Sequence, residues 1–551
     1  MSNQAKLQII PLGGLGEIGK NMTAIKYEDT IVVIDSGLAF PEDELLGIDL
    51  VIPDISFLVE NQEKVKAILL THGHEDHVGA LPYVLREINP PIYGSKLTLG
   101  IVEGKLKEHI LKDVQLNIVR PRDMIIIEPF EIEFFRVCHS IPDCMGIAIH
   151  TPLGIILHTG DIKLDQTPVD GQIVDFRKMA ELGEKGVLVM LGDSTNAERP
   201  GFTKSESVVG KTFDELFGKC EGRIIVTTFA SNVHRVQQAI NTAQKYGRKV
   251  AVVGRSMVNN VKISGQLGYL NIPEDILIDM EDINKYPPEK IVIATTGSQG
   301  EPMSALTRMA TADHRWVGIK PGDTVIISAT PIPGNEKLVA RTIDLLFKQG
   351  ADVIYDREAG VHVSGHASQD ELRLLLNIIK PKYFIPVHGE YRHQVKHAQL
   401  AESLGIPRSH ICVAENGNII EISEKKIHVA GKVAAGRVLI DGLGVGDVGN
   451  IVIRDRRQLS QDGIIIVVVT LSNGLVVSGP DIVSRGFVYV RESEELMDNA
   501  KAKVNEALEY CSSKHIAEWA SIKSQIRDKL GKHLYEKTGR RPMIMPIIME
   551  A

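Results

Sequence analysis

Three histidines and an aspartate stand close together in the segment His72-Gly73-His74-Glu75-Asp76-His77. This segment directly follows the apolar run from Val65 to Leu70, which is typical of a buried strand. Two histidines separated by one residue at a strand end, such as His72 and His74, can direct both rings at one ion, and Asp76 and His77 can reach a second ion. Zinc binds imidazole nitrogen at about 2.0–2.1 Å and carboxylate oxygen at a similar distance. We therefore predict a metal site here rather than a solvated polar turn.

Other candidate ligands follow apolar stretches elsewhere in the chain. They are His139 in RVCHSIPD, Asp161 in LHTGD and His388 in PVHGE. Taken singly, His139 also fits a core histidine, Asp161 a helix N-cap and His388 a turn residue. Together with the segment from His72 to His77, the set predicts a site for two ions. Asp35, at the end of the apolar run IVVI, is predicted to orient a ligand histidine rather than to bind metal itself.

Short apolar runs that end in polar or glycine-rich turns recur along the chain, as expected for buried strands of a layered α/β protein. They cover 31–34, 67–70, 154–157, 187–191, 224–228, 250–253, 291–294, 324–328 and 383–387. Each run is followed at once by residues suited to chemistry, such as THGH, TGD or HGE. Because ligands gather outside the carboxyl ends of strands in open α/β sheets, these elements predict one shared site.

The last part of the chain reads as a separate small α/β domain. Residues 427–450 are rich in Gly and Val and indicate a domain junction with small strands. Apolar runs at 464–471 and 487–490 follow, and then two amphipathic helices, with apolar residues at three-to-four spacing from Leu496 to Cys511 and from Ile516 to Leu534. A final strand is predicted from Met543 to Met549.

Composition excludes several classes of protein. The chain has 551 residues, 62 Lys and Arg against 70 Asp and Glu, and a formal net charge of −8. Its 43% hydrophobic and 24% charged residues fit an ordered globular protein rather than a disordered, collagen-like or coiled-coil chain. The acidic balance argues against a protein that coats nucleic acid by bulk charge. The scattered cysteines, and an apolar run at 464–471 too short for a membrane span, predict a cytoplasmic protein without a membrane partner.

The HxHxDH pattern from His72 to His77, followed by a distant His, an Asp and a final His, resembles the metallo-β-lactamase superfamily. The resemblance implies a four-layer αβ/βα sandwich with a dinuclear metal site. It implies two Zn²⁺ ions, with Mn²⁺ or Mg²⁺ as alternatives. One ion would be bound by His72, His74 and His139, the other by Asp76, His77 and His388, and Asp161 would bridge them.

Further motifs resemble the β-CASP group of that superfamily and, within it, the bacterial ribonuclease J family. They are the segment 192–196 (GDSTN), the segment 363–368 (VSGHAS) and PVHGE. Longer similar strings are LGGLGEIGKN (12–21), FPEDELLGID (40–49), FASNVHR (229–235), TGSQGEP (296–302), PIPGN (331–335), SRGFVY (484–489) and RRPMIMPIIME (540–550). The resemblance covers the whole chain. It implies a metallo-β-lactamase domain split into 1–205 and 363–445, an inserted β-CASP domain at 206–362, and a linker with a C-terminal domain at 446–551.

The same resemblance implies roles in catalysis and substrate binding. Asp76, Asp193 and His366 are the expected catalytic residues, with His366 at the phosphate and Asp193 behind it near the metals. A buried hydrogen-bonding histidine is the alternative for His366. The family's pocket for a 5′-monophosphate corresponds to Ser231, Asn232, Val233, His362, Val363, Ser364, Gly365 and His366. Backbone N–H groups and hydroxyls around Ser364 suit an anion nest. Arg255 is a further phosphate candidate or a plain surface residue.

The implied activity is that of a zinc-dependent ribonuclease with 5′→3′ exonuclease and endonuclease activity in rRNA maturation and mRNA decay. RNA with a 5′-monophosphate would be the preferred substrate, and a two-metal activated water the nucleophile. An RNA-binding scaffold with little activity and a small-molecule metallo-hydrolase are the alternatives. The resemblance also implies a homodimer or homotetramer and a paralogue or RNA-decay enzyme as partner. Gly47, Asp49 and Asp441 match a family calcium site, although loop aspartates are often only solvated.

Overall fold

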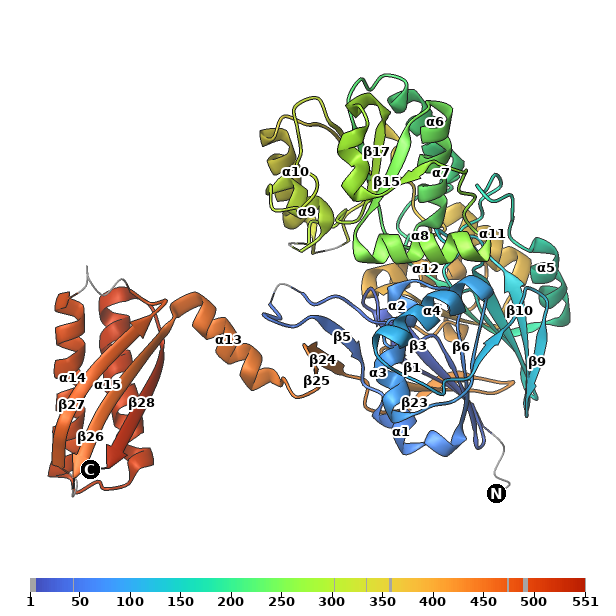
Figure 1. Ribbon diagram of the computed structural model, residues 1–551. Helices are drawn as coiled ribbons and strands as arrows, with labels where there is room; N and C mark the ends of the chain where they lie inside the picture. The colour runs from blue at the N-terminus through green and yellow to red at the C-terminus, as the bar shows by residue number, and fades with distance from the viewer. Residues whose placement is uncertain are drawn as a thin grey trace, which may run out of the picture. The chain divides into compact units, whose positions relative to one another are not determined.

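The computed structural model describes residues 6–42, 44–301, 303–332, 334–355, 359–472, 475–488 and 494–550. It separates into two compact units, the first formed by 1–40 and 50–438 and the second by 41–49 and 439–551. Figure 1 shows the elements of each unit. None of the helices among the described residues is long and apolar enough to cross a membrane.

The first unit contains two mixed sheets that pack face to face. One sheet has the order β23-β22-β1-β3-β4-β6-β7-β8 and the other has the order β20-β13-β12-β11-β10-β9. The strands of the first are β1 (Leu7–Gly13), β3 (Met22–Tyr27), β4 (Thr30–Ile34), β6 (Val65–Leu69), β7 (Ile92–Gly94), β8 (Leu116–Ile118), β22 (Asn418–Ile422) and β23 (Ile427–Lys432). The strands of the second are β9 (Met124–Ile127), β10 (Phe130–Arg136), β11 (Met145–Thr151), β12 (Gly154–His158), β13 (Val187–Asp193) and β20 (Tyr383–Val387).

The core between these sheets is built from alternate residues of both. Ile9, Ile25 and Val32 of the first sheet share one buried cluster with Phe134 and Ile147 of the second. Helices cover the outer faces, so that the four layers form the expected αβ/βα sandwich (Figure 1). These helices are α1 (Ser56–Glu60), α2 (Glu75–Val78), α3 (Leu81–Glu87), α4 (Lys96–Glu108), α5 (Phe176–Lys185), α11 (Gln369–Ile379) and α12 (Tyr391–Ser403). The short strands β2 (Leu15–Gly16) and β21 (Gly389–Glu390) pair beside them, and β5 spans Leu50–Pro53.

A third sheet is inserted between two neighbouring strands of the sandwich. β13 and β20 pair in parallel, yet the chain between them builds an all-parallel sheet of order β16-β15-β17-β14-β18-β19. Its elements are β14 (Ile224–Thr227), β15 (Lys249–Val253), β16 (Leu277–Ile278), β17 (Ile291–Thr295), β18 (Thr324–Ile327), β19 (Asp352–Ile354), α6 (Ser207–Phe217), α7 (Val233–Lys245), α8 (Arg255–Leu267), α9 (Ala305–Ala310) and α10 (Glu336–Lys348). The nine strands predicted from apolar runs are therefore confirmed, with ends shifted by at most two residues.

The second unit ends in an α/β layer, as the sequence predicts. β26 (Ile464–Ser472) lies between β27 (Leu475–Arg485) and β28 (Met543–Glu550), and α14 (Glu494–Ser513) and α15 (Trp519–Thr538) pack on one face of this sheet. The hairpin of β24 (Arg437–Asp441) and β25 (Gly444–Val445) and the helix α13 (Asn450–Asp462) precede it. In the apolar run at 487–490, residues 489 and 490 lie outside the described residues.

Candidate active site

The predicted ligands come from the carboxyl ends of strands and meet at one edge of the sandwich. His72 and His74 follow β6, and Asp76 and His77 lie in the short helix α2 directly after them. The remaining three ligands each follow a strand of the second sheet, namely His139 after β10, Asp161 after β12 and His388 after β20. The structure brings all seven side chains into two clusters that share Asp161.

The first cluster is formed by three imidazoles and one carboxylate. His74 Nδ1 lies 3.1 Å from His72 Nε2 and 3.1 Å from His139 Nε2. Asp161 Oδ2 lies 3.6 Å from His72 Nε2 and 3.5 Å from His139 Nε2. Four potential ligand atoms therefore surround one point.

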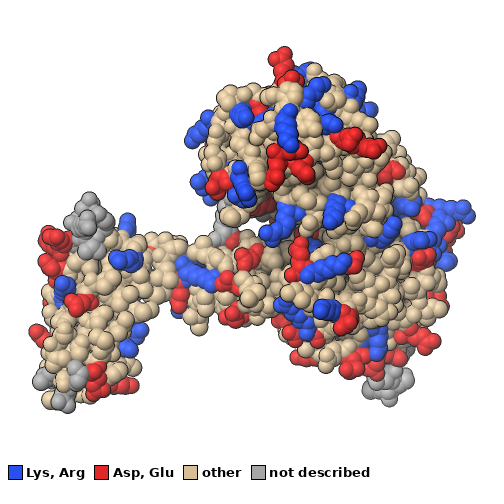
Figure 2. Space-filling view, in the orientation of Figure 1, with Lys and Arg blue, Asp and Glu red and all other residues tan. Residues whose placement is uncertain are grey.

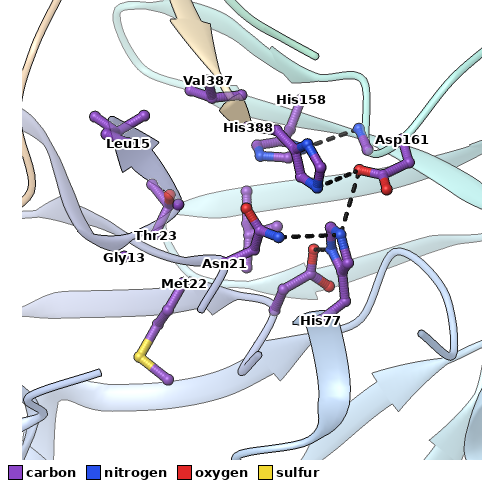
Figure 3. Close-up of a pocket in the computed structure, with 14 residues that line it drawn as sticks. Gly13, Leu15, Asn21, Met22, Thr23, His77, His158, Asp161, Val387 and His388 are labelled. Carbon is purple, nitrogen blue, oxygen red and sulfur yellow. Dashed lines mark hydrogen bonds and ion pairs between the residues drawn. The ribbon is translucent and has the colours of Figure 1, made fainter. Parts of the chain in front are cut away.

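The second cluster uses the other oxygen of the same aspartate. Asp161 Oδ1 lies 3.3 Å from His77 Nε2 and 3.5 Å from His388 Nε2. Asp76 Oδ2 completes the group, 3.3 Å from His388 Nε2 and 3.6 Å from His77 Nε2. Figure 3 shows Asp161 facing both His77 and His388, with the Asn21 amide directed at His77.

These spacings fit divalent metal ions. Ligand atoms about 2.0–2.1 Å from a tetrahedral zinc ion stand about 3.3 Å apart, which is the range found in both clusters. Asp161 Oδ1 is buried and accepts no hydrogen bond from the described residues. A buried carboxylate oxygen without such a partner is costly unless a cation compensates it. The donor set therefore suits an ion in each cluster.

The protonation states of the first cluster also fit metal binding, whereas in the second cluster the charge of Asp161 outweighs burial and raises the pKa of His388 to about 9 and that of His77 well above its ordinary value. Burial lowers the pKa of His74 to about 4 and lowers the pKa values of His72 and His139 well below the ordinary histidine value. Burial alone would raise the pKa of Asp161, but the neighbouring histidines, led by His388, lower it well below its ordinary value. Neutral imidazoles and an ionised carboxylate are the forms that bind metal.

Hydrogen bonds behind the ligands select which ring nitrogen faces each cluster. His77 Nδ1 donates to Asp35 Oδ2 at 2.7 Å, and Asp35 is fixed in turn by the Thr71 backbone N–H and hydroxyl, each at 2.8 Å. His139 Nδ1 donates to the carbonyl oxygen of Gly365 at 2.7 Å. In both histidines this leaves Nε2 for an ion, the arrangement typical of metal-bound histidine. A Cβ on Gly365 would lie 2.5 Å from the His139 ring, so this close approach requires glycine.

A carboxylate–histidine pair stands directly beside the two clusters. His366 Nδ1 donates to Asp193 Oδ2 at 2.7 Å, and Asp193 Oδ1 accepts from the backbone N–H and hydroxyl of Thr195 at 3.0 and 2.8 Å. The His366 ring centroid lies 4.8 Å from that of His139 and 5.2 Å from that of His388. Burial would raise the pKa of Asp193, but His366 lowers it to about 2. Asp193 therefore holds His366 at the edge of the metal clusters.

The two halves of the predicted phosphate pocket lie on different domains of the first unit. Asn232 caps α7, with its side chain accepting from the Arg235 backbone N–H at 3.0 Å, and Val233 is buried behind it. In the other half, Asn196 Nδ2 donates to Ser364 Oγ at 2.8 Å and to the His366 carbonyl at 2.9 Å. Ser231, His362 and Ser364 are half-buried, whereas Val363 and Gly365 are buried.

The structure adds positioning residues that the sequence did not single out. Thr195 accepts from His388 Nδ1 at 2.6 Å and so links the Asp193 pair to a metal ligand. Glu371 is fully buried and accepts from the backbone N–H groups of Leu164, Thr203 and Ser368. The spacing of Ser368 and Glu371 is that of a capping box, a signal that was available in the sequence.

Two weaker candidates lie outside the clusters. Arg255 is exposed at the first position of α8. In the predicted calcium site, Asp49 Oδ2 accepts from the Gly442 backbone N–H at 2.8 Å, while Asp441 pairs with Arg456, which also donates to the Leu46 carbonyl at 3.0 Å. The Arg456 guanidinium thus already supplies a positive charge to Asp441. Calcium binding by Gly47, Asp49 and Asp441 stays a prediction.

Comparisons with known families agree with this architecture along the chain. Family models match residues 15–180 (metallo-beta-lactamase superfamily), 221–346 (ribonuclease J, beta-CASP domain), 350–411 (Zn-dependent metallo-hydrolase RNA specificity domain) and 451–551 (ribonuclease J C-terminal domain). A solved structure of a protein of unknown function from Enterococcus faecalis V583 aligns with a TM-score of 0.54 at 16% identity, covering 76% of this chain and 100% of that chain. At that identity it supports the fold alone.

The fold and the two clusters define a metallo-β-lactamase hydrolase that carries an inserted β-CASP domain. Ribonuclease J2 of Bacillus subtilis (strain 168) is 48% identical over 551 residues, covering 100% of this chain and 99% of the relative. Ribonuclease J 2 of Staphylococcus aureus (strain MRSA252) is 45% identical over 547 residues, with 99% and 98% coverage. The chain belongs to the ribonuclease J family.

Proposed function

We propose that this member of the ribonuclease J family, a metal-dependent hydrolytic ribonuclease, degrades RNA from 5′-monophosphate ends in the 5′→3′ direction and also cuts internally. We place it in the cytoplasm, in rRNA maturation and mRNA decay. The observation that carries the proposal is one continuous arrangement, in which two metal-type clusters share Asp161 and the Asp193–His366 pair borders both.

The proposed metals are two Zn²⁺ ions, with Mn²⁺ or Mg²⁺ as alternatives. When bound, a pair of divalent ions lowers the pKa of water and neutralises charge on the scissile phosphate. His72, His74 and His139 would hold one ion, Asp76, His77 and His388 the other, and Asp161 both. Asp193 keeps His366 Nδ1 occupied, so that Nε2 can contact the phosphate. Water attacks phosphorus and loses a proton as its oxygen forms the new P–O bond, while the bond between phosphorus and the 3′-oxygen breaks and that oxygen takes up a proton.

The phosphate pocket supports the proposed direction of cleavage. The hydroxyls of Ser231 and Ser364 suit a terminal 5′-phosphate, because hydrogen bonds to a charged group are strong. The backbone N–H groups of Asn232, Val233, His366, Ala367 and Ser368 already donate to other groups of the protein. A pocket at a fixed distance from the metals would release one nucleotide for each cut. Figure 2 shows Lys and Arg interspersed with Asp and Glu over the visible face, and the chain carries a net charge of −8. RNA binding is therefore proposed to depend on an enclosed channel rather than on a broadly basic surface.

The first prediction tests this function with RNA labelled at either end and carrying a 5′-monophosphate or a 5′-triphosphate. We expect mononucleotide release, measured on denaturing gels, to be about tenfold faster or more from the monophosphate, because only that end fits the pocket. Chelation of divalent ions should stop all cleavage. RNA that is bound but never cut with added Zn²⁺ or Mn²⁺ would instead indicate a scaffold. Failure to bind RNA at all would favour a small-molecule hydrolase.

We further propose that the second unit joins two copies of the chain into a dimer, or two dimers into a tetramer. The sheet face away from α14 and α15 carries mainly apolar side chains beside the exposed Asp481, which lies opposite Val468. Ile466 and Val468 are half-buried, and Val483, Met545 and Ile547 are 43%, 45% and 39% exposed. Uncovered apolar patches of this kind often mark interaction sites. A paralogous chain with a similar face is the alternative partner.

The second prediction concerns this face. Val468→Asp should convert the dimer or tetramer to a monomer in sedimentation velocity, because the carboxylate would be buried without a partner in the joined sheets. Tyr510→Asp is the matched control, since Tyr510 is 42% exposed on α14, on the other side of the sheet. A wild-type monomer, or a variant that associates as the wild type does, would contradict the proposed interface.

A further inference from the structure

Arg235 is the largest of the fully buried side chains in the first unit, and its guanidinium is paired on several sides. Nε and Nη2 donate to the two carboxylate oxygens of Glu206 at 2.6 and 3.0 Å. Nη1 donates to the carbonyl and hydroxyl oxygens of Ser328 at 2.7 and 2.8 Å and to the Val361 carbonyl at 3.4 Å. A rigid planar fork with five N–H donors can bind all three partners at once, and lysine cannot.

The partners of Arg235 lie on the two connections between the domains of the first unit, which we call the crossings. The chain leaves the sandwich after β13 and reaches α6 through Glu206. It returns from β19 to α11 and β20 through Val361. Ser328, directly after β18, holds the return segment as well, because its hydroxyl donates to the Val361 carbonyl at 2.6 Å. One side chain of the inserted domain therefore fastens both crossings.

Both crossings continue into the site. The Glu206 backbone N–H donates to Asp165 Oδ2 at 2.9 Å, and Asp165 follows the shared ligand Asp161 by four residues. Val361 directly precedes the segment from His362 to His366. Arg235 itself lies in the first turn of α7, which Asn232 caps. The guanidinium thus connects the metal loop with both halves of the phosphate pocket.

We propose that Arg235 is a positioning residue that fixes the distance between the 5′-phosphate pocket and the metal clusters, an inference that rests on the proposed function. The Arg235–Glu206 pair holds the inserted domain at one angle to the sandwich. A shift of about 1 Å in substrate position can cost about a hundredfold in rate. Loosening the crossings should therefore impair end recognition while leaving the metal clusters intact.

The same domain offers a matched control pair. Arg223 binds Asp323 through two hydrogen bonds of 2.8 and 2.5 Å, and both residues are buried. They directly precede β14 and β18, at the amino ends of the parallel strands, whereas Arg235 and Ser328 lie at the carboxyl ends. Arg223→Lys removes the same kind of buried pair without touching either crossing. It therefore controls for loss of stability alone.

The third prediction compares Arg235→Lys with Arg223→Lys in the full-length, metal-loaded protein. Arg235→Lys should raise KM for 5′-monophosphorylated RNA about tenfold or more and abolish the preference over 5′-hydroxyl RNA. Hydrolysis of bis(p-nitrophenyl) phosphate should stay within about twofold of wild type, because this small diester does not reach the phosphate pocket and needs only the metal centre and His366, which Asp193 still holds. Arg223→Lys should keep the wild-type KM and end preference even if its melting temperature falls as far as that of Arg235→Lys.

Two results would overturn the inference: a wild-type KM and end preference in Arg235→Lys, or an equal loss in both variants. A wild-type protein that does not distinguish the two RNA ends would refute the proposed 5′-phosphate recognition instead. In that case the role of Arg235 can still be tested by measuring hydrogen–deuterium exchange over residues 359–366. Faster exchange in Arg235→Lys alone supports a clamp on this segment, and unchanged exchange rejects it.

Discussion

Replacing His74 by alanine is expected to lower RNA hydrolysis at least about a thousandfold while RNA binding persists. His74 Nδ1 stands at 3.1 Å from both other ring nitrogens of the first cluster, so its removal opens that cluster to water. A bound ion contributes several kcal/mol to transition-state stabilisation, and about 1.4 kcal/mol corresponds to a tenfold change in rate. His74 is half-buried, and the loss of its ring should leave the fold intact. Single-turnover cleavage, gel-shift binding and metal content would be measured together.

His150→Ala is the matched control for this variant. His150 is a half-buried histidine of β11, with Nε2 3.5 Å from Glu133 Oε2. The first residue of β11, Met145, bonds to the metal loop at Thr71, so His150 lies about 16 Å further along the strand at about 3.3 Å per residue. It should keep wild-type cleavage and metal content. Full activity of His74→Ala would contradict the interpretation of the site as two metal clusters.

Four of the six described strands of the inserted sheet could be predicted from the sequence, but only five of the fourteen described strands of the two sandwich sheets, namely β4, β6, β12, β13 and β20. The predicted strands are largely buried on both faces. Such strands appear as continuous apolar runs with sharp polar ends, as in 187–191 and 291–294. β27 escaped prediction since Gly479 and Pro480 interrupt its apolar pattern. Proline is tolerated there because β27 is an edge strand. α13 escaped because it buries only Ile453 and shows no broad apolar stripe.

The ligand side chains could be predicted from the sequence, but most of the groups that orient them could not. His72 to His77 form a local pattern, and the other ligands follow readable strand ends. Asp35 was predicted as an orienting carboxylate for the same reason, and it bonds His77. The carbonyl of Gly365 that accepts from His139 could not be predicted from the type of residue, because every residue has a backbone carbonyl. The role of Arg235 could not be predicted either, because only the fold shows that it binds both crossings.

The Asp193–His366 pair should act as one unit in catalysis, separate from metal binding. His366 donates to Asp193 at 2.7 Å, and Thr195 fixes the carboxylate from the other side. An asparagine at 193 keeps the size of the side chain but removes the charge that orients and stabilises the imidazole. Loss of a positioned acid–base or phosphate-binding group typically costs about 10²–10⁴-fold. His366→Ala and Asp193→Asn should each lower kcat by about a hundredfold or more.

A double-mutant cycle distinguishes this unit from two independent contributions. If Asp193 acts through His366, the variant carrying both changes should be no slower than the slower single variant, since the second change removes an interaction already lost. Both single variants should retain wild-type metal content, because the seven ligands of the two clusters remain. Multiplicative losses would show that Asp193 supports catalysis by another route, through Thr195 and His388, which is bonded to Thr195 Oγ1 at 2.6 Å. Loss of metal from Asp193→Asn would show instead that this carboxylate is needed to hold the metal ligands in position.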